Sequence, residues 1–382
     1  MTGTPNPGLL SGLLVIEIAQ FLAGPSAALR LGDLGARVIK VERKGAGDIC
    51  RSLYLSDTAI AGDSTLFHAI NRNKESVAAD LKDPEDLAFV DQLLARADVV
   101  IHNFRPGVAE RLGIGVEALR TRHPRLIIGT ISGYGEAGPW AALPGQDLLA
   151  QALSGVMWLN GSAGDGPVPV GLSVGDMLAG HVLVEGVLAA LVRRGITGEG
   201  AHVATSLLEA LVDFQFEVLT TYLNDGRRPP QRAAANNAHA YLAAPYGVYR
   251  TADGHLALAM TPLPRLAALL DFELPGGDAG FASRDAVKQA IAARLAEGTN
   301  AQWMEYLRAD DIWCAPVLDW DGLLETEAFD RLDLLQTIGR PGAQLETTRS
   351  PLRVDGTRPA STRGAPAVGE HDAAIREEFG AA

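Results

Sequence analysis

The stretch LLVIEIAQFLAGPSAALRLGDLGARVIKVE, residues 13–42, decides the fold of this chain. Its first part, Leu13–Ala19, is a β-branched and aliphatic run that predicts a strand, and Arg37–Glu42 predicts a second one. Between them, Ser26–Asp33 has the apolar spacing of a helix. A helix that joins two successive strands allows those strands to run parallel, so this stretch predicts a strand–helix–strand unit.

The same alternation continues through the first half of the chain. Strand-like runs at Ser76–Leu81, Val99–Asn103 and Leu126–Ile131 alternate with helical patterns at Pro84–Ala97 and Val116–Thr121. Repeated alternation of this kind is typical of an α/β protein with a doubly wound, mostly parallel sheet. We therefore expect helices on both faces of that sheet.

The second half has a different pattern. Helices are predicted at Gln146–Leu159, Asp176–Arg194 and Ser206–Leu223, and a β-hairpin is predicted around Asp253-Gly254. A terminal helix is expected at His371–Phe379. From these patterns we expect four segments: a large domain at 1–205, a linker helix at 206–230, a smaller α+β domain at 231–320, and a return to the large domain at 321–382.

Composition excludes several classes of protein. The 382 residues have a formal net charge of −13 that is spread along the chain, which disfavours binding to nucleic acid or to an anionic membrane. The N-terminus is polar and the apolar run Val182–Val192 is short and contains Glu185, so we expect a cytoplasmic protein without a membrane span. Cys50 and Cys314 lie far apart, so neither a disulfide scaffold nor a metal site is expected.

Cations in the connections of the predicted sheet suggest an anionic ligand. Arg43 and Arg105 each follow a predicted strand, and Arg72 and Lys74 precede one. Ligands bind at strand ends in open α/β sheets, and each cation taken singly is also compatible with a solvated surface. The glycines of Gly32-Asp-Leu-Gly35 follow the first helix instead of beginning it, and no P-loop sequence occurs, which disfavours a nicotinamide or P-loop enzyme.

Eight runs of the chain, in the same order, resemble the signature stretches of class III (CaiB/BaiF) CoA-transferases, which include formyl-CoA transferase and are related to the α-methylacyl-CoA racemases. They span nearly the whole sequence, so the resemblance is far more specific than any single motif. The runs are AGPSAALRLGDLGARVIKVER, NRNK, NFRPGVAERLGIG, ISGYGEAGP, GLSVGD, TGEGAHVATSLLEA, CAPV and GAPAVGEH.

The resemblance implies a Rossmann-like large domain, a small domain and an interlocked homodimer. It also implies that the large domain binds coenzyme A or acyl-CoA as a substrate, together with a small carboxylic acid. Phe104 and Tyr134 would offer aromatic or hydroxyl contacts, although ordinary packing remains open for Phe104. The positions that match the family's CoA contacts are Ala23, Arg43, Asn71, Arg72, Asn73, Lys74, Asn103, Phe104, Arg105, Arg111, Ser132, Gly133, Tyr134 and Gly135.

The catalytic aspartate of the resembled transferases matches Asp176 in the run 171–176, GLSVGD. From the residues alone, Asp176 is first of all a helix N-cap, because it precedes an apolar helical run. The same place would keep a carboxylate ionised through the helix dipole and backbone N–H groups, and Gly175 would leave room for an acyl group. The resemblance then implies that Asp176 attacks the acyl-CoA thioester and carries the acyl group as a mixed anhydride.

The racemase hypothesis stays open beside the transferase hypothesis. Racemases of this family use a His–Asp pair, and the place of their histidine is Gln146 here, which cannot serve as a general base near neutral pH. His181 or His239 remain as substitutes, and each is also compatible with a structural role.

The acceptor acid and the catalytic competence also stay open. No run of glycines occurs between Arg227 and Arg250, where 236–239 is Asn-Asn-Ala-His, and Leu22 stands where some oxalate-active members have a polar residue. Both features leave oxalate in doubt and other acids open, including dicarboxylic acids of the succinate, itaconate or mesaconate kind as well as carnitine-like or aromatic acids. A CoA-binding dimer that has lost turnover is the remaining alternative.

Overall fold

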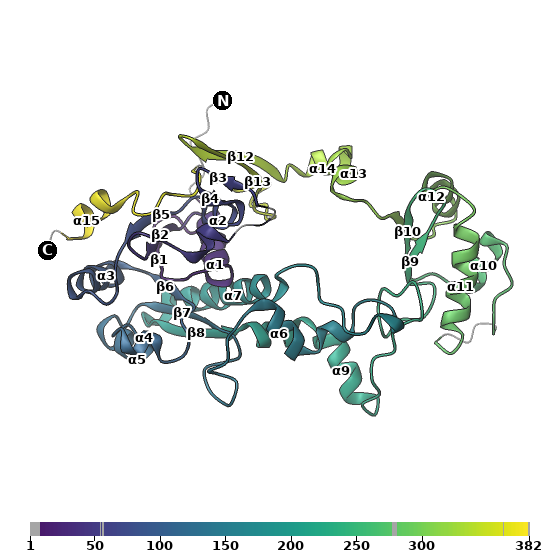
Figure 1. Ribbon diagram of the computed structural model, residues 1–382, viewed down its shortest axis with the longest axis horizontal. Helices are drawn as coiled ribbons and strands as arrows, with labels where there is room; N and C mark the ends of the chain where they lie inside the picture. Colours follow the sequence, from purple (N-terminus) through teal and green to yellow (C-terminus); the bar gives the residue numbers. More distant parts are fainter. Residues whose placement is uncertain (1–7, 54, 56, 277–280, 362, 381–382) are drawn as a thin grey trace. The chain divides into compact units, whose positions relative to one another are not determined.

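The computed structural model describes residues 8–53, 55, 57–276, 281–361 and 363–380 (Figure 1). The polar N-terminal residues 1–7 and residues 277–280 of the expected smaller α+β domain lie outside this set. Two compact units are present. The first comprises Met1–Ala150, Ser173–Phe214 and Leu332–Ala382, and the second comprises Gln151–Leu172 and Gln215–Arg331. The domain limits expected from the sequence, at 205, 230 and 320, stay a prediction.

A six-stranded parallel sheet forms the centre of the first unit (Figure 1). Its strand order, β5-β2-β1-β6-β7-β8, is that of a doubly wound nucleotide-binding sheet, so the expected α/β architecture is confirmed. The strands pair in register, with Ile16 opposite Ile39 and Val100 opposite Ile128. Their bounds are β1 (Leu14–Glu17), β2 (Arg37–Glu42), β5 (Glu75–Ala78), β6 (Val99–His102), β7 (Ile127–Ser132) and β8 (Ala201–Ser206).

Helices cover both faces of this sheet, as the alternating pattern predicts. On one face, Ile16 and Ile128 share a core with α3 (Pro84–Arg96), α5 (Val116–Arg122) and α15 (Asp372–Gly380). On the other face lie α1 (Ala23–Asp33) and α7 (Val174–Thr197), which pack against each other. Successive strand residues point to opposite faces, so each strand contributes to both cores.

Helix α7 is long and apolar enough to cross a membrane by length and composition alone. Within the first unit it packs against α1, β7, β8 and α8 (Leu207–Phe214). A methyl group added at Gly129 of β7 would lie 3.3 Å from Leu183, which shows how closely α7 approaches the sheet. The helix ends at Gly198, which has the left-handed conformation that favours glycine.

Three sequence predictions need correction here. The helix expected at Gln146–Leu159 is the shorter α6 (Asp147–Ser154), because Gly155 has a left-handed backbone with a φ of 88°.

Strand β8 was not expected, because His202, Thr205 and Ser206 interrupt the apolar character of the run AHVATS, yet it pairs with β7 along its full length. The helix expected at Ser206–Leu223 is two helices, α8 and α9 (Phe216–Asn224), because Gln215 leaves the helical conformation. The Gln215 side chain donates to the carbonyl oxygen of Ser154 at 3.3 Å.

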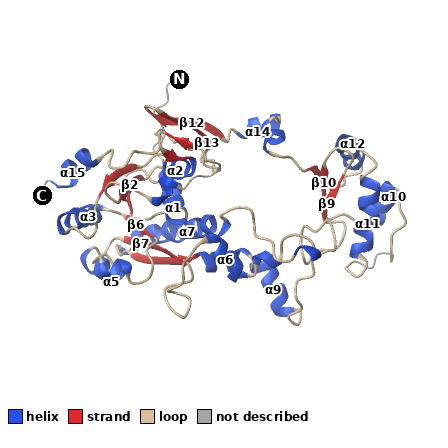
Figure 2. Cartoon of the chain, viewed as in Figure 1, coloured by secondary structure: helices blue, strands red, loops and turns tan. Residues whose placement is uncertain are grey.

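The second unit contains a three-stranded antiparallel sheet in the order β11-β10-β9. Figure 2 shows β9 and β10 of this sheet in red. The predicted hairpin is confirmed, since Leu256 pairs with Tyr249 and the chain turns at residues 251–254. Helices pack against this sheet around a separate apolar core. The elements are β9 (Gly247–Arg250), β10 (His255–Leu258), β11 (Cys314–Pro316), α10 (Leu263–Leu270), α11 (Arg284–Leu295), α12 (Asn300–Ala309) and α13 (Trp320–Leu324).

Shorter elements complete the described chain. Most belong to the first unit, and η2 and η3 belong to the second, while α6 and α14 each cross a limit between the units. They are η1 (Ile49–Ser52), β3 (Ala59–Ile60), β4 (Asp63–Ser64), α2 (Thr65–Asn71), α4 (Val108–Arg111), α6 (Asp147–Ser154), η2 (Val156–Trp158), η3 (Ala163–Asp165), α14 (Glu327–Leu332), β12 (Leu335–Arg340) and β13 (Ala343–Thr348).

Candidate active site

The strand order places a ligand crevice at the carboxyl ends of β1 and β6. These neighbouring strands continue to opposite faces of the sheet, β1 into α1 and β6 into α4, and such a switch point opens a crevice. Hydrogen bonds join the two connections there. Asn103 accepts a hydrogen bond from Gln20 N at 2.9 Å and donates one to Gln20 O at 2.7 Å.

A groove of about 330 Å³ lies at the carboxyl ends of these strands, and we call it the nucleotide groove. Two predicted CoA contacts, Arg43 and Phe104, line it together with Lys82. Both cations are exposed, and Leu81 and Leu112 provide apolar walls.

Two carboxylates also line the groove, Asp80 and Glu42, of which Glu42 is paired with Arg51. The exposed cations and the apolar walls are compatible with a ring system that carries phosphates. The sequence analysis missed Lys82. It follows β5 as Arg43 follows β2, so the rule that ligands bind at strand ends would have found it.

The predicted contacts at Asn71–Lys74 are mostly buried, and their charges are balanced inside the protein. Arg72 donates to Asp33 at 3.0 Å, and Lys74 lies 2.6 Å from Glu17. Burial is the main cause that lowers the pKa of Lys74, to about 8, with the Glu17 charge opposing it. Asn73 has a left-handed backbone with a φ of 62°. Contact of this segment with CoA stays a prediction, while its visible role is structural.

A glycine contact links the end of β7 to the segment before α6. Gly133 and Gly145 approach so closely that a methyl group on Gly133 would lie 2.7 Å from the Gly145 Cα atom. Tyr134 donates its hydroxyl to Pro144 O at 3.0 Å, and Gly135 N donates to Ser132 Oγ at 3.0 Å. This packing places the predicted Ser132–Gly135 turn beside the start of α6.

The remaining predicted contacts differ in exposure. Arg105 and Arg111 are exposed, the former after β6 and the latter on α4. Ala23 is buried at the first position of α1. The structure therefore brings Arg43, Asn103 and Phe104 to the crevice region, together with the backbone at the start of α1.

Asp176 is the third residue of α7, and this corrects the expectation that it is the N-cap. Ser173 holds the N-cap position without a capping side-chain hydrogen bond. The capping acceptor comes from α6: Asp147 Oδ1 accepts from Gly175 N at 2.6 Å and from Asp176 N at 3.2 Å. The Asp176 carboxyl is therefore not used to hold the helix end. No local pattern in the sequence signals this long-range cap.

The protonation of Asp176 also differs from expectation. Burial and, as the smaller cause, the negative charge of Asp147 together raise its pKa to about 7. The helix N-terminus does not overcome these two effects, so the carboxylate is not held strongly ionised. A carboxylate with a pKa near neutrality is a better nucleophile than an ordinary aspartate and still ionises at physiological pH.

Close packing of α1 on α7 sets the surroundings of Asp176. A methyl group at Gly180 would lie 2.4 Å from Ser26 Oγ and 2.9 Å from Ala23 O. Gly180 is four residues after Asp176 and shares its helix face. Met177 packs against a cluster that contains Leu22. Asp176 therefore belongs to the part of α7 that meets the connection between β1 and α1.

The racemase hypothesis concerns Gln146, His181 and His239, and it stays untested. Gln146 is exposed just before α6. One ring nitrogen of His181 lies 2.6 Å from the Met177 carbonyl oxygen, and His239 Nε2 lies 3.7 Å from Glu217 Oε1. Among the described residues, no group of three or more His, Cys, Asp or Glu side chains is arranged to hold a metal.

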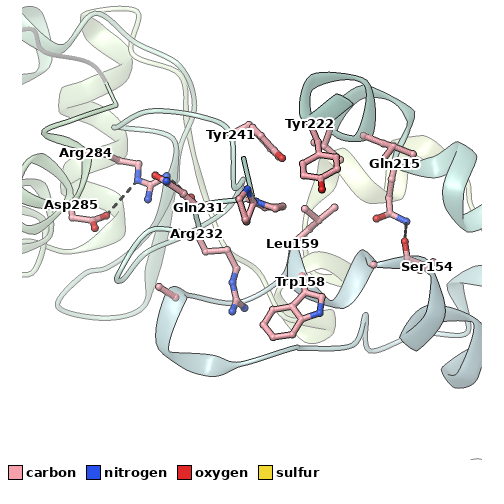
Figure 3. Close-up of a pocket in the computed structure, with 16 residues that line it drawn as sticks. Ser154, Trp158, Leu159, Gln215, Tyr222, Gln231, Arg232, Tyr241, Arg284 and Asp285 are labelled. Carbon is pink, nitrogen blue, oxygen red and sulfur yellow. Dashed lines mark hydrogen bonds and ion pairs between the residues drawn. The ribbon is translucent and has the colours of Figure 1, made fainter. Parts of the chain in front are cut away.

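A larger cavity of about 890 Å³ lies within the second unit (Figure 3). Its walls are mainly apolar and aromatic, with Trp158, Leu159 and Tyr222 among them. Arg284 and Asp285 form an ion pair of 3.4 Å at one side. None of the predicted site residues lines this cavity.

Comparison with known proteins identifies the family. Residues 10–372 match CoA-transferase family III, and the chain belongs to that family. It is 34% identical over 393 residues to an acetyl-CoA:oxalate CoA-transferase of Acetobacter aceti, covering 98% of this chain and 96% of that protein. It is 32% identical to a succinyl-CoA:mesaconate CoA-transferase of Haloarcula hispanica, covering 98% and 97% respectively.

A solved structure agrees with this assignment. A CaiB/BaiF family protein from Brucella suis superimposes with a TM-score of 0.85 at 30% identity, covering 98% of this chain and all of that chain. The protein is therefore a CoA-transferase, an enzyme of a class that takes acyl-CoA as substrate. The family expectation drawn from the sequence motifs is confirmed.

Proposed function

We propose that this enzyme transfers CoA from an acyl-CoA thioester to a small dicarboxylic acid, with Asp176 carrying the acyl group as a mixed anhydride. The observation that carries this proposal is the Asp176 carboxyl, which has a raised pKa of about 7. It lies in the first turn of α7, which meets the connection between β1 and α1. Two relatives are named for oxalate and mesaconate, both dicarboxylates, which supports the acceptor class.

The first step is attack by a carboxylate oxygen of Asp176 on the thioester carbonyl carbon. The carbon–sulfur bond breaks, and CoA leaves as a thiolate that the nucleotide groove retains. The acceptor carboxylate then attacks the Asp176 carbonyl carbon of the anhydride, and the donor acid leaves. Finally the thiolate attacks the acceptor acyl carbon, which forms the new thioester and frees Asp176.

Burial and the charge of Asp147 assist formation of the anhydride. Both disfavour the negative charge of Asp176, as its raised pKa shows. Acylation removes that charge, so the covalent intermediate escapes a penalty that the free carboxylate carries. Asp147 still fixes the geometry, because it holds the backbone N–H groups of Gly175 and Asp176.

The CoA part of the proposal rests on Arg43, Lys82 and Phe104. The two exposed cations would pair with phosphates, and the Phe104 ring would contact the adenine. Arg105, Arg111 and the Ser132–Gly135 turn remain candidates along the same edge.

An Asp176→Asn variant tests the nucleophile. We expect exchange between acetyl-CoA or succinyl-CoA and oxalate or mesaconate to disappear, because an amide cannot form the anhydride. Binding of CoA, measured by calorimetry, should stay within about twofold of the parent, since the cations of the groove are unchanged. Substantial turnover by this variant would remove Asp176 from the proposed role.

We also propose that the protein is a cytoplasmic homodimer whose chains interlock. Large apolar side chains on α6, α7 and α9 stay exposed in the single chain, among them Leu148, Ile196 and Phe216. Exposed large apolar side chains of this kind support an interface. Light scattering should give twice the mass of one chain, and a monomer at micromolar concentration would contradict the proposal.

A further inference from the structure

Four charged side chains are buried inside the first unit, next to the connection between β1 and α1. At most 2% of any of them is exposed. Lys40 Nζ lies 2.6 Å from Glu17 Oε1 and 2.8 Å from Asp48 Oδ2. Lys74 Nζ lies 2.6 Å from Glu17 Oε2, so positive and negative charges are balanced. We call this group the charge cluster, and its members are Glu17, Lys40, Asp48 and Lys74.

Two members of the charge cluster bind the backbone of the connection. Lys40 donates to Ala19 O at 2.9 Å, and Asp48 Oδ1 accepts from Phe21 N at 3.2 Å. Asp48 Oδ1 also accepts from Cys50 N at 2.9 Å, which fixes the carboxylate itself. The side chain of Asp48 therefore joins the segment after β2 to the connection between β1 and α1.

Two further side chains hold the same stretch of backbone. Asn103 accepts from the N–H of Gln20 and donates to its carbonyl oxygen. Lys74 donates to Pro25 O, in the first turn of α1, at 2.9 Å. Side chains from β2, from the segment after it and from the end of β6 thus hold residues 19–21, which leaves this backbone little freedom to move.

The backbone of the connection is strained at Phe21. Its φ of 63° lies in the left-handed region, which is unfavourable for a bulky aromatic residue. Phe21 is 43% exposed, and its N–H is held by Asp48. Non-glycine residues persist in this region only where the surroundings enforce the conformation, and they are concentrated at functional sites. The hydrogen bond to Asp48 provides that enforcement.

The connection lies between the two parts of the proposed site. Gln20 lines the nucleotide groove. Two residues later, Leu22 belongs to an apolar cluster against which Met177 packs. Met177 directly follows Asp176 in α7. The connection therefore extends from the groove that would hold CoA to the helix turn that carries the nucleophile.

Stability of the fold does not by itself require the charge cluster. Burial opposes the charge of Lys40, but the carboxylates of Glu17 and Asp48 raise its pKa above that of an ordinary lysine, so it stays charged. Replacement of a buried ion pair by apolar side chains is often neutral or stabilising, because desolvation offsets the attraction. Apolar side chains could not provide the bonds that Lys40 and Asp48 make to the connection.

We propose that Asp48 is a positioning residue for the transfer reaction. Paired with Lys40, its carboxylate holds the N–H of Phe21. It thereby keeps the connection in the conformation that directs the thioester carbonyl carbon from the nucleotide groove toward Asp176. Asp48 makes no bond to the substrate and moves no proton in the reaction. The inference rests on the role proposed above for Asp176.

Two double variants that are matched in charge isolate the hydrogen bond to Phe21. Lys40→Met with Asp48→Leu removes both bonds to the connection, whereas Lys40→Met with Asp48→Asn keeps an oxygen that accepts from Phe21 N. Both remove one positive and one negative charge, which leaves Glu17 paired with Lys74. Differences between the two variants therefore report the acceptor at position 48 and not the loss of charge.

CoA exchange between succinyl-CoA and mesaconate, or acetyl-CoA and oxalate, is measured on the full-length protein, together with CoA binding by calorimetry. The variant with Asp48→Leu should lose roughly 30- to 100-fold in kcat, because a misplacement of about 1 Å between reacting groups can cost two orders of magnitude. The variant with Asp48→Asn should regain at least about tenfold of this loss. The dissociation constant of CoA should change by less than about threefold in both, since Arg43 and Lys82 are retained.

Asp98→Ala is the control for a purely structural effect. Like Asp48, Asp98 accepts from a backbone N–H, that of Leu14 at 2.8 Å, and pairs with a cation, Arg194 at 2.8 Å. It lies at the opposite end of β1 from the connection. The substitution should lower the temperature of unfolding and leave kcat within about twofold of the parent. If a double variant fails to fold, Asp48→Ala alone replaces it, and the same loss of kcat is expected.

Equal kcat in the two double variants would overturn the inference, and so would an effect confined to CoA affinity. A loss of kcat in Asp98→Ala as large as that in the variant with Asp48→Leu would also overturn it, because the role of Asp48 would then be structural. Hydroxylamine trapping on the parent separates this inference from the proposed function. A parent without an acyl label on Asp176 overturns both, whereas a labelled parent with equal kcat in the two double variants overturns the inference alone.

Discussion

Replacement of Asp147 by asparagine should move the pH dependence of catalysis toward acid. The new amide side chain would keep an oxygen to accept from Gly175 N and Asp176 N, so the helix cap survives. The negative charge of the carboxylate, however, would be gone. That charge is the second cause, after burial, of the raised pKa of Asp176. The substitution therefore separates the electrostatic effect of Asp147 from its structural one.

The magnitude follows from the pKa of Asp176. Relative to the ordinary value of 3.8, a pKa of about 7 is a rise of roughly three units, and burial accounts for the larger share. Asp147 can thus contribute at most about half, and we expect the apparent pKa to fall by about one unit. At pH 6 the ionised fraction of Asp176 would rise about fivefold.

The assay is the pH profile of kcat/KM for CoA exchange, which reports groups of the free enzyme. The parent should gain activity as pH rises through about 7, where Asp176 ionises. Asp147→Asn should reach its plateau at lower pH. Glu185→Gln, a neutralisation farther along α7, is the control and should not shift the profile. An unshifted profile in Asp147→Asn, or a shift toward alkali, would refute the reasoning.

Three further predictions concern stability and binding. The pKa of Asp176 is higher in the folded than in the unfolded protein, so stability is lost as the pH rises from about 4 to 7. Asp176→Asn should therefore raise the free energy of unfolding by roughly 2–4 kcal/mol at pH 8 and leave it unchanged at pH 3.5. Urea titrations at the two pH values measure this difference. Gly180→Ala forces a methyl group against α1 and should lower the free energy of unfolding by about 1–3 kcal/mol. Gly195→Ala in the same helix meets no neighbour and should raise that free energy slightly. Equal effects of the two substitutions would contradict the packing of α1 on α7. Arg43→Ala and Lys82→Ala should each weaken CoA binding by roughly tenfold and reduce its salt dependence in calorimetry, and unchanged affinity would place the phosphates elsewhere.

Local patterns predicted much of the sheet. Arg37–Glu42 is a strand with the predicted bounds, and β6 and α3 differ from prediction by one residue at one end. These segments have strong apolar periodicity, so short-range sequence carries the information. The strand β8 lacks that periodicity, and its pairing with β7 is a long-range contact that no local pattern encodes.

The site was less predictable, because its properties depend on distant partners. The family motif selected Asp176, but its raised pKa depends first on burial in the folded chain and then on the charge of Asp147, which is 29 residues earlier and accepts a hydrogen bond from Asp176 N. Arg72 and Lys74 looked like ligand-binding cations in the sequence, and the structure gives each a buried carboxylate partner. Charge pairing of this kind appears only once the chain is folded.

Trapping of the acyl intermediate tests the central claim most directly. The enzyme is incubated with an acyl-CoA and hydroxylamine, and the peptide that contains Asp176 is weighed by mass spectrometry. The account predicts a hydroxamate on Asp176 that depends on acyl-CoA and is absent from Asp176→Asn. CoA exchange that proceeds at its normal rate while this peptide stays unmodified would contradict it.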